Sequence, residues 1–175
     1  MILEPLDPGP DHALPGELLT EVTEVYAANR EFFALSGDFP DPDAITGAQV
    51  AVALADELAQ PGAEVLLARA GGRLVGLTVT LAHHPHAAER DDPDPWIGLL
   101  MIAADRQRQG YGRELAGAVE DRFREAGRTG VRLAVLDANP EALAFWTALG
   151  YEEIARRPDL QLDRPCRVLR KPLAR

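Results

Sequence analysis

The sequence predicts an α/β fold built on a mixed sheet, with elements in the order β-α-α-β-β-β-α-β-α-β-β. Apolar residues in the first third of the chain recur at three- and four-residue spacing, which is typical of helices. Two β-prone runs are then joined by Gly71-Gly72, a two-residue hairpin signal. The second half alternates short apolar runs with helical segments that end at glycines. Because no repeat or low-complexity linker divides the 175 residues, we expect a single domain over 1–175.

The first half of the chain holds a strand, two helices and a hairpin. Residues 1–6 form the expected strand, and a helix is expected over 16–36 from its periodic apolar residues. These residues are Leu18, Leu19, Val22, Val25, Tyr26 and Phe33. After a proline-rich break at 38–43, an alanine-rich helix is predicted over 44–59, and Gln60-Pro61-Gly62 stops it. The hairpin pairs residues 64–70 with residues 73–82.

The second half begins with a polar loop and an apolar run over 96–103, which predicts a strand covered on both faces. A helix of about 16 residues follows the segment 107–112, with its apolar residues four apart on one face. A strand is expected over 131–136. Asn139 and Pro140 suit the N-cap and first turn of a short helix that Gly150 closes. Two final strands are expected over 151–156 and 166–171.

Composition narrows the functional classes. The 28 acidic residues outnumber the 18 basic ones, and the net charge of −10 argues against binding nucleic acid or an anionic membrane. The same charge leaves open a cationic substrate such as an amine. The N-terminus lacks the features of a signal peptide, no apolar run approaches the roughly 20 residues that span a bilayer, and Cys166 has no partner for a disulfide. We therefore expect a cytoplasmic protein.

The sharpest local feature is Gln107-Arg108-Gln109-Gly110-Tyr111-Gly112, between the apolar strand and the amphipathic helix. Backbone N–H groups at a helix start are unpaired, and glycines let phosphate oxygens approach them. The segment is therefore a candidate pyrophosphate cradle, although a glycine pair before a helix is also a common turn. It is neither a dinucleotide fingerprint, because Leu115 stands at the third glycine position, nor a Walker A loop.

A second motif follows downstream: Asn139-x-x-Ala142-x-x-Phe145-Trp146-x-x-x-Gly150-Tyr151. Together the two motifs resemble the GNAT superfamily of N-acetyltransferases. The patterns of that family are Q/R-x-x-G-x-G/A after the fourth strand and N-x-x-A-x-x-F/L-Y-x-x-x-G-F around the fourth helix. The resemblance covers almost the whole chain. It implies the GNAT acyl-CoA N-acyltransferase fold, with a mixed, mostly antiparallel sheet of about seven strands and four helices.

The resemblance implies that acetyl-CoA is the acyl donor and that no metal is needed. Its pyrophosphate would be held by the backbone amides of Arg108, Gln109, Gly110, Tyr111, Gly112 and Arg113. Its pantetheine arm would pair with the strand edge at Leu100, Met101 and Ile102, and an amide near Ile102 would polarise the thioester. Asn139 matches the family's cofactor-contacting asparagine and also suits a helix N-cap. Trp146 would form a wall for the pantetheine arm.

Two positions depart from the family pattern. Trp146 stands where the family has its usual general acid, a tyrosine, and an indole N–H cannot supply a proton. Positions 96 and 98, where relatives carry a base, hold Trp96 and a glycine. The base must then come from the preceding loop, and we favour His84, which is in phase with Thr78 and Thr80. The other candidates are His83, His86, Glu89, Asp91, Asp92 and Asp94. The histidine spacing in that loop does not favour a metal site.

The acceptor would lie near the first two helices, where Tyr26, Asn29 and Phe33 offer aromatic and polar contacts, together with Trp96 and loop carboxylates such as Asp159. The aromatic residues are equally compatible with a core position. We predict an N-acetyltransferase that moves an acetyl group to a primary amine by direct attack in a ternary complex. The alternative is a catalytically weak acyl-CoA-binding or sensing domain. The family resemblance also favours a homodimer.

Overall fold

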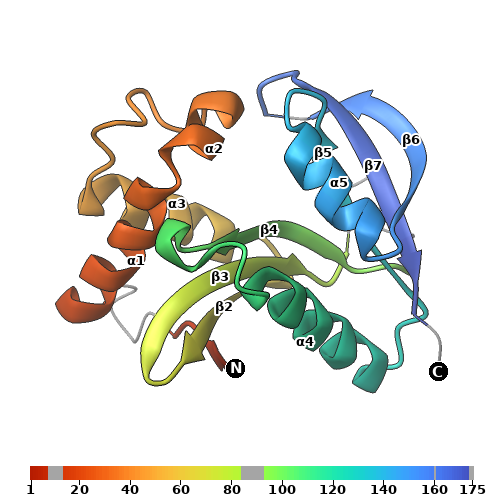
Figure 1. Ribbon diagram of the computed structural model, residues 1–175, viewed down its shortest axis with the longest axis horizontal. Helices are drawn as coiled ribbons and strands as arrows, with labels where there is room; N and C mark the ends of the chain where they lie inside the picture. Colours follow the sequence, from red (N-terminus) through yellow and green to blue (C-terminus); the bar gives the residue numbers. More distant parts are fainter. Residues whose placement is uncertain (8–13, 84–92, 160, 174–175) are drawn as a thin grey trace. The chain divides into compact units, whose positions relative to one another are not determined.

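A computed structural model describes residues 1–7, 14–83, 93–159 and 161–173 (Figure 1). These residues form an α/β fold with a seven-stranded sheet, as the sequence predicts, and the strands are ordered β1-β2-β3-β4-β5-β7-β6. The chain divides into two compact units. The first unit comprises Met1–Thr80 with Leu99–Ala118, and the second comprises Leu81–Gly98 with Val119–Arg175.

The first unit begins with a strand that pairs with the later hairpin. Its elements are β1 (Ile2–Pro5), α1 (Gly16–Ala28), α2 (Arg30–Ser36), α3 (Gly47–Leu58), β2 (Ala63–Ala70) and β3 (Arg73–Leu81). β1 pairs antiparallel with β2, and α3 packs against α1 and β2. Gly71 and Gly72 both have positive φ (57° and 79°), as the two-residue hairpin predicted between β2 and β3 requires. Val22, Leu54 and Leu77 lie in the apolar core of this unit, each at most 1% exposed.

The helix expected over 16–36 is interrupted at Asn29, so the described residues contain five α-helices rather than four. Asn29 has φ −98° and ψ 30°, and its N–H donates to the carbonyl of Tyr26 (3.0 Å). The third helix starts three residues later than predicted because Thr46 caps it. The Thr46 hydroxyl accepts from the Gln49 N–H (3.3 Å), and the Gln49 side chain accepts from the Thr46 N–H (2.9 Å).

The remaining elements follow the predicted order. They are β4 (Trp96–Ile102), the 3₁₀ helix η2 (Ala104–Arg106), α4 (Tyr111–Glu125), β5 (Gly130–Leu136), α5 (Pro140–Ala148), β6 (Glu152–Pro158) and β7 (Pro165–Pro172). β4 and β5 are parallel, whereas β5 with β7 and β6 with β7 are antiparallel. β4 and α4 are each divided between the two units: residues 99–102 of β4 and residues 111–118 of α4 belong to the first unit. The mixed, mostly antiparallel sheet is confirmed.

A buried carboxylate organises the second unit. Asp94 is 2% exposed, and its Oδ2 accepts from Nε of Arg170 (2.6 Å) and Nε of Arg132 (3.1 Å). A side chain at Gly130 would place its Cβ 2.5 Å from Oδ1 of Asp94, so it would have to displace the side chains of this cluster. The residues immediately before β4 are thereby tied to β5 and β7.

Candidate functional site

The glycine-containing loop leads from η2 directly into α4. Arg108 has a positive φ of 59° and Gly110 one of 91°, which turns the chain into the helix. The first amide of α4 with a backbone acceptor is that of Glu114, which donates to the carbonyl of Gly110 (3.0 Å). The N–H groups of Tyr111, Gly112 and Arg113 donate to no backbone carbonyl of the described residues. The loop therefore presents a run of donors at a helix N-terminus, and the space beside Gly110 is open.

The end of β4 lies in the same unit as this loop. The N–H of Ala103 donates to the carbonyl of Val75 on β3 (2.9 Å). Because the two ends of a trans peptide point in opposite directions, the Ile102 carbonyl faces away from β3. Leu100 is half-buried, whereas Met101 and Ile102 are buried. The structure thus brings the loop at 108–113 and the strand edge at 100–102 into one unit, as a two-part cofactor site requires.

Two side-chain amides donate hydrogen bonds to the carbonyl of Ile102. Asn29 donates to it from Nδ2 (3.0 Å), and Gln107 donates to it from Nε2 (3.2 Å). Gln107 Nε2 also donates to Oδ1 of Asn29 (2.9 Å), while Asn29 Nδ2 donates to the carbonyl of Val25 (2.8 Å). The side chain of Asn29 is buried and bonded within the chain, and its predicted contact with the acceptor stays a prediction. No role was predicted for the Gln107 side chain, although its place at the first position of the motif was a signal.

The aromatic residues predicted for the acceptor lie in the core of the first unit. Tyr26 and Phe33 are each 3% exposed and stacked, with ring centroids 5.2 Å apart, and Phe39 packs edge-on against both. Burial raises the pKa of Tyr26, and the nearby carboxylates of Glu57 and Asp38 raise it further. Their contact with an acceptor stays a prediction. Their packing matches the alternative that the sequence left open.

Trp96 belongs to the second unit and is also buried, with the Arg157 guanidinium 5.9 Å from the centroid of its ring. Asn139 caps α5 there, because its Oδ1 accepts from the N–H of Ala142 (3.0 Å). Trp146, on the same helix, is 7% exposed and meets Tyr151 edge-on, with ring centroids 5.0 Å apart. The cap confirms one of the two roles that Asn139 suits. Cofactor contacts of Asn139 and Trp146 stay predictions.

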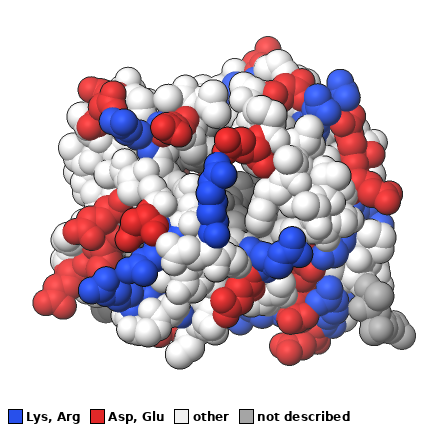
Figure 2. Space-filling model, viewed as in Figure 1, with Lys and Arg blue, Asp and Glu red and all other residues white. Residues whose placement is uncertain are grey.

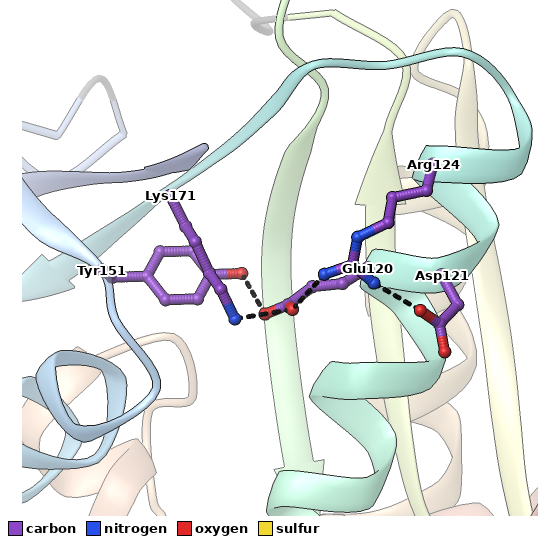
Figure 3. Close-up of polar contacts among 5 residues, drawn as sticks. All are labelled: Glu120, Asp121, Arg124, Tyr151 and Lys171. Atoms are coloured by element: carbon purple, nitrogen blue, oxygen red, sulfur yellow. Dashed lines mark hydrogen bonds and ion pairs between the residues drawn. The ribbon is translucent and has the colours of Figure 1, made fainter. Parts of the chain in front are cut away.

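Tyr151, a tyrosine near Trp146 in sequence, is held inside the second unit (Figure 3). It is 1% exposed, and its hydroxyl donates to Oε1 of Glu120 (3.2 Å). Oε2 of Glu120 accepts from Lys171 Nζ (2.7 Å) and from Arg124 (3.3 Å). Burial raises the pKa of Tyr151 well above its ordinary value, and the charge of Glu120 adds to this effect. A group in this state does not give up its proton readily.

The candidate bases are only partly described. Burial alone would raise the pKa of Asp94, but hydrogen bonds and charge from Arg170 and Arg132 hold it below its ordinary value. Asp94 is therefore committed to its two arginines. His83 is exposed, and the favoured base, His84, lies outside the described residues. The other loop candidates, His86, Glu89, Asp91 and Asp92, also lie outside them.

Three further properties concern charge, metals and membranes. On the face of the molecule in Figure 2, acidic and basic side chains are interspersed rather than separated into areas of one sign. In the part of the chain that the structure describes, no three His, Cys, Asp or Glu side chains gather as a metal site would require. Of the helices in that part, none is long and apolar enough to span a bilayer.

Comparison with solved structures shows the fold. An acetyltransferase from Thermus thermophilus has a TM-score of 0.70 at 23% identity, covering 99% of this chain and 98% of that one. The spermidine N-acetyltransferase of Vibrio cholerae, solved with CoA and spermine, gives 0.68 at 13% identity, covering 98% and 95%. The ribosomal-protein-S18-alanine N-acetyltransferase of Escherichia coli gives 0.64 at 15% identity, covering 99% and 94%.

A search of the curated proteins found no match to this sequence. The family model described as "Acetyltransferase (GNAT) family" matches residues 23–151, which include both sequence motifs and parts of both units. The resemblance drawn from the two motifs is thereby confirmed. The chain belongs to the GNAT family of acetyltransferases, whose members transfer an acyl group from acetyl-CoA to an amine.

Proposed function

We propose that this protein is an N-acetyltransferase that moves an acetyl group from acetyl-CoA to a primary amine by direct attack in a ternary complex. One observation carries the proposal: the first unit holds both the unpaired amides at the start of α4 and the edge of β4 at Ile102. These two parts match the two chemistries of the donor, a pyrophosphate and an amide-bearing arm. The two units together form the single domain in this proposal.

The residues present fit acetyl-CoA. The N–H groups of Tyr111, Gly112 and Arg113 would hold the pyrophosphate, assisted by the positive end of the helix dipole. The β4 edge would hold the pantetheine arm, with the Ile102 N–H directed at the thioester oxygen. When bound, acetyl-CoA supplies a thioester carbonyl that an amine can attack.

Direct attack is favoured over a covalent acyl-enzyme. Cys166 is the single cysteine of the chain and is 6% exposed, and burial raises the pKa of its thiol. A nucleophilic cysteine needs the opposite environment, one that stabilises the thiolate. The amine of the acceptor is then the nucleophile, and it must lose a proton to a base or to water. The CoA thiolate is a tolerable leaving group without a general acid, because a thiol has a pKa of about 8.5.

The cradle is tested by thermal unfolding with and without acetyl-CoA. We expect acetyl-CoA to raise the Tm of the wild type, and Gly112→Glu to abolish the shift by placing a carboxylate among the phosphate donors. Gly117→Glu is the matched control, because it adds the same charge to the same helix, where a side chain meets no atom within 4 Å. A Gly112→Glu variant that responds like the wild type would show that the loop is not the phosphate site.

A second candidate function is an acyl-CoA sensor with little or no turnover. It is favoured by Trp146 at the position of the family's acid and by the commitment of Tyr151 and Asp94 to other partners. Thiol release from acetyl-CoA, followed with a panel of amines, separates the two. The panel contains a polyamine, an aminoglycoside, free amino acids and a peptide with an N-terminal alanine. Saturable, amine-dependent release supports the enzyme, whereas a Tm shift without release from any amine supports the sensor.

A further inference from the structure

We propose that Asn29 and Gln107 are positioning residues, which together hold the Ile102 peptide and the start of the phosphate loop in the orientation that binds CoA. The inference rests on the proposed function, since it concerns how the same site is built. The pair joins three segments of the first unit: the break between α1 and α2, the end of β4, and the loop that precedes α4. Neither side chain needs to touch the cofactor for this role.

The geometry fixes which backbone group of Ile102 is available on the edge of β4 that faces away from β3. Its carbonyl faces away from β3 and already accepts from Asn29 (3.0 Å) and Gln107 (3.2 Å). In an extended strand the N–H and the carbonyl of one residue point to the same edge. The Ile102 N–H is therefore left as the donor at this residue, and the adjoining Ile102–Ala103 peptide is held through its carbonyl. A donor held in advance binds a thioester oxygen without the cost of being ordered.

The loop is held at the residue where its turn begins. Gln107 follows η2 and directly precedes Arg108, whose positive φ of 59° redirects the chain toward α4. Because the Gln107 side chain is tied to Asn29 and Ile102, the origin of this turn is fixed relative to β4. The spacing between the β4 edge and the amides of α4 is then set by one hydrogen-bonded unit. CoA, which would contact both, is sensitive to that spacing.

The direction of each hydrogen bond predicts which substitutions are tolerated. Among the described residues Gln107 bonds only through its amide nitrogen, which donates twice, so a side chain with donors alone can replace it. This accounts physically for a motif that begins with either glutamine or arginine. A glutamate at 107 has the same length but no donors. Asn29 uses both ends of its amide, accepting from Gln107 and donating to Val25 and Ile102, so aspartate cannot replace it.

The test measures the Kd of CoA by titration calorimetry for the wild type and for Gln107→Ala, Gln107→Glu, Gln107→Arg, Asn29→Ala and the double alanine variant. We expect Gln107→Ala and Gln107→Glu to weaken CoA binding about tenfold, a change of about 1.4 kcal/mol, and Gln107→Arg to bind within about threefold of the wild type. The double variant is expected to bind CoA no more weakly than the single variant with the lower affinity, because each side chain acts through the other. In turnover, the KM for acetyl-CoA rises while the KM for the amine is unchanged.

The control is Gln49→Ala, which removes a glutamine whose side chain accepts from the N–H and the hydroxyl of Thr46 in the same unit. It is expected to lower the Tm without changing the Kd of CoA. If the alanine variants do not fold, the comparison of Gln107→Arg with Gln107→Glu still tests the inference. Equal CoA affinities in these two variants would overturn it. Wild-type affinity in Gln107→Ala and Asn29→Ala would overturn it too. A wild type that binds no CoA would instead remove the proposed function.

Discussion

The hydroxyl of Tyr151 donates a hydrogen bond to Oε1 of Glu120 at 3.2 Å, inside a cluster that Lys171 and Arg124 complete (Figure 3). Glu120 is 3% exposed, so its charge is compensated by these two cations rather than by water. The raised pKa of Tyr151 follows from its burial and from this neighbour. The cluster therefore gives Tyr151 a structural role, although it is among the tyrosines closest in sequence to the position where the family carries its acid.

The first prediction is that Tyr151→Phe leaves kcat unchanged within about twofold and lowers the free energy of unfolding by about 1 kcal/mol, the typical worth of one hydrogen bond. The ring keeps its contact with Trp146, so only the bond to Glu120 is lost. Urea unfolding and steady-state turnover measure the two quantities. A fall in kcat of about a hundredfold with little change in stability would identify Tyr151 as a general acid instead.

The second prediction concerns Asp94. Replacing it with asparagine leaves Arg132 and Arg170 without their shared carboxylate, and we expect the free energy of unfolding at pH 7 to fall by about 2–4 kcal/mol. The pKa of Asp94 is lowered in the folded state, so its stabilising effect is present above the unfolded value of about 3.9 and is lost as the pH falls below it. Urea unfolding of both proteins at pH 7 and at several values down to about pH 2.5 follows this difference.

The same variant also tests the chemistry. If Asp94 is committed to its arginines, Asp94→Asn keeps the shape of the pH–rate profile of the wild type. Loss of the rising limb of that profile, in a variant that is still folded, would make Asp94 the base.

The fold was predictable because its elements are set by local patterns. The Gly71-Gly72 hairpin, the N-cap of Asn139 and the four-residue spacing in α4 each depend on neighbours within a few residues, and each formed where expected. The break at Asn29 was not predicted, and the side chain there bonds the carbonyl of Ile102, a partner 73 residues away that no local pattern reveals. Glu120 likewise appears as one polar residue among many on α4. Its burial requires Tyr151 and Lys171, which are 31 and 51 residues distant.

The candidate site was predictable in part for the same reason. The loop at 108–113 is a contiguous motif, so its position followed from the sequence, and the structure places it after the end of β4 in the chain and in the same unit. The acceptor residues were inferred from residue type and from the region where the family resemblance places the acceptor. Tyr26 and Phe33 satisfy the same pattern as core residues, and their packing matches the core interpretation, while acceptor contact stays a prediction.

The third prediction concerns Asp159 in the connection between β6 and β7. Burial would raise its pKa, but the hydrogen bond from Arg164 and three backbone N–H groups lower it to about 2. Asp159 therefore stabilises the fold above about pH 4, and this contribution is lost as the pH falls toward 2. We expect Asp159→Asn to cost about 1–2 kcal/mol at pH 7, with the difference from the wild type shrinking below about pH 4.

The measurement is urea unfolding of both proteins at pH 7, 5 and 3.5. Because Asp159 is occupied by these donors, Asp159→Asn is also expected to leave the KM of a cationic amine unchanged. A large rise in that KM, with stability unaltered, would place Asp159 at the acceptor.

The fourth prediction concerns Gly76 on β3, opposite the end of β4. A Cβ at this position would collide with the Met101 carbonyl oxygen and lie 2.8 Å from Cδ1 and 3.2 Å from Cα of Ile102. Gly76→Ala must therefore push the two strands apart where Ile102 offers its N–H. We expect a loss of about 1–3 kcal/mol in stability, typical of overpacking, together with weaker binding of CoA.

Gly117→Ala is the matched control, because a Cβ there meets nothing within 4 Å and a helical glycine is replaced by a better helix former. It is expected to keep the Kd of CoA and to hold or raise the Tm. Calorimetric titration with CoA and thermal unfolding measure both variants. If Gly76→Ala loses stability but binds CoA as the wild type does, the Ile102 edge is not where the pantetheine arm lies, since a displaced donor cannot leave its ligand's affinity unchanged.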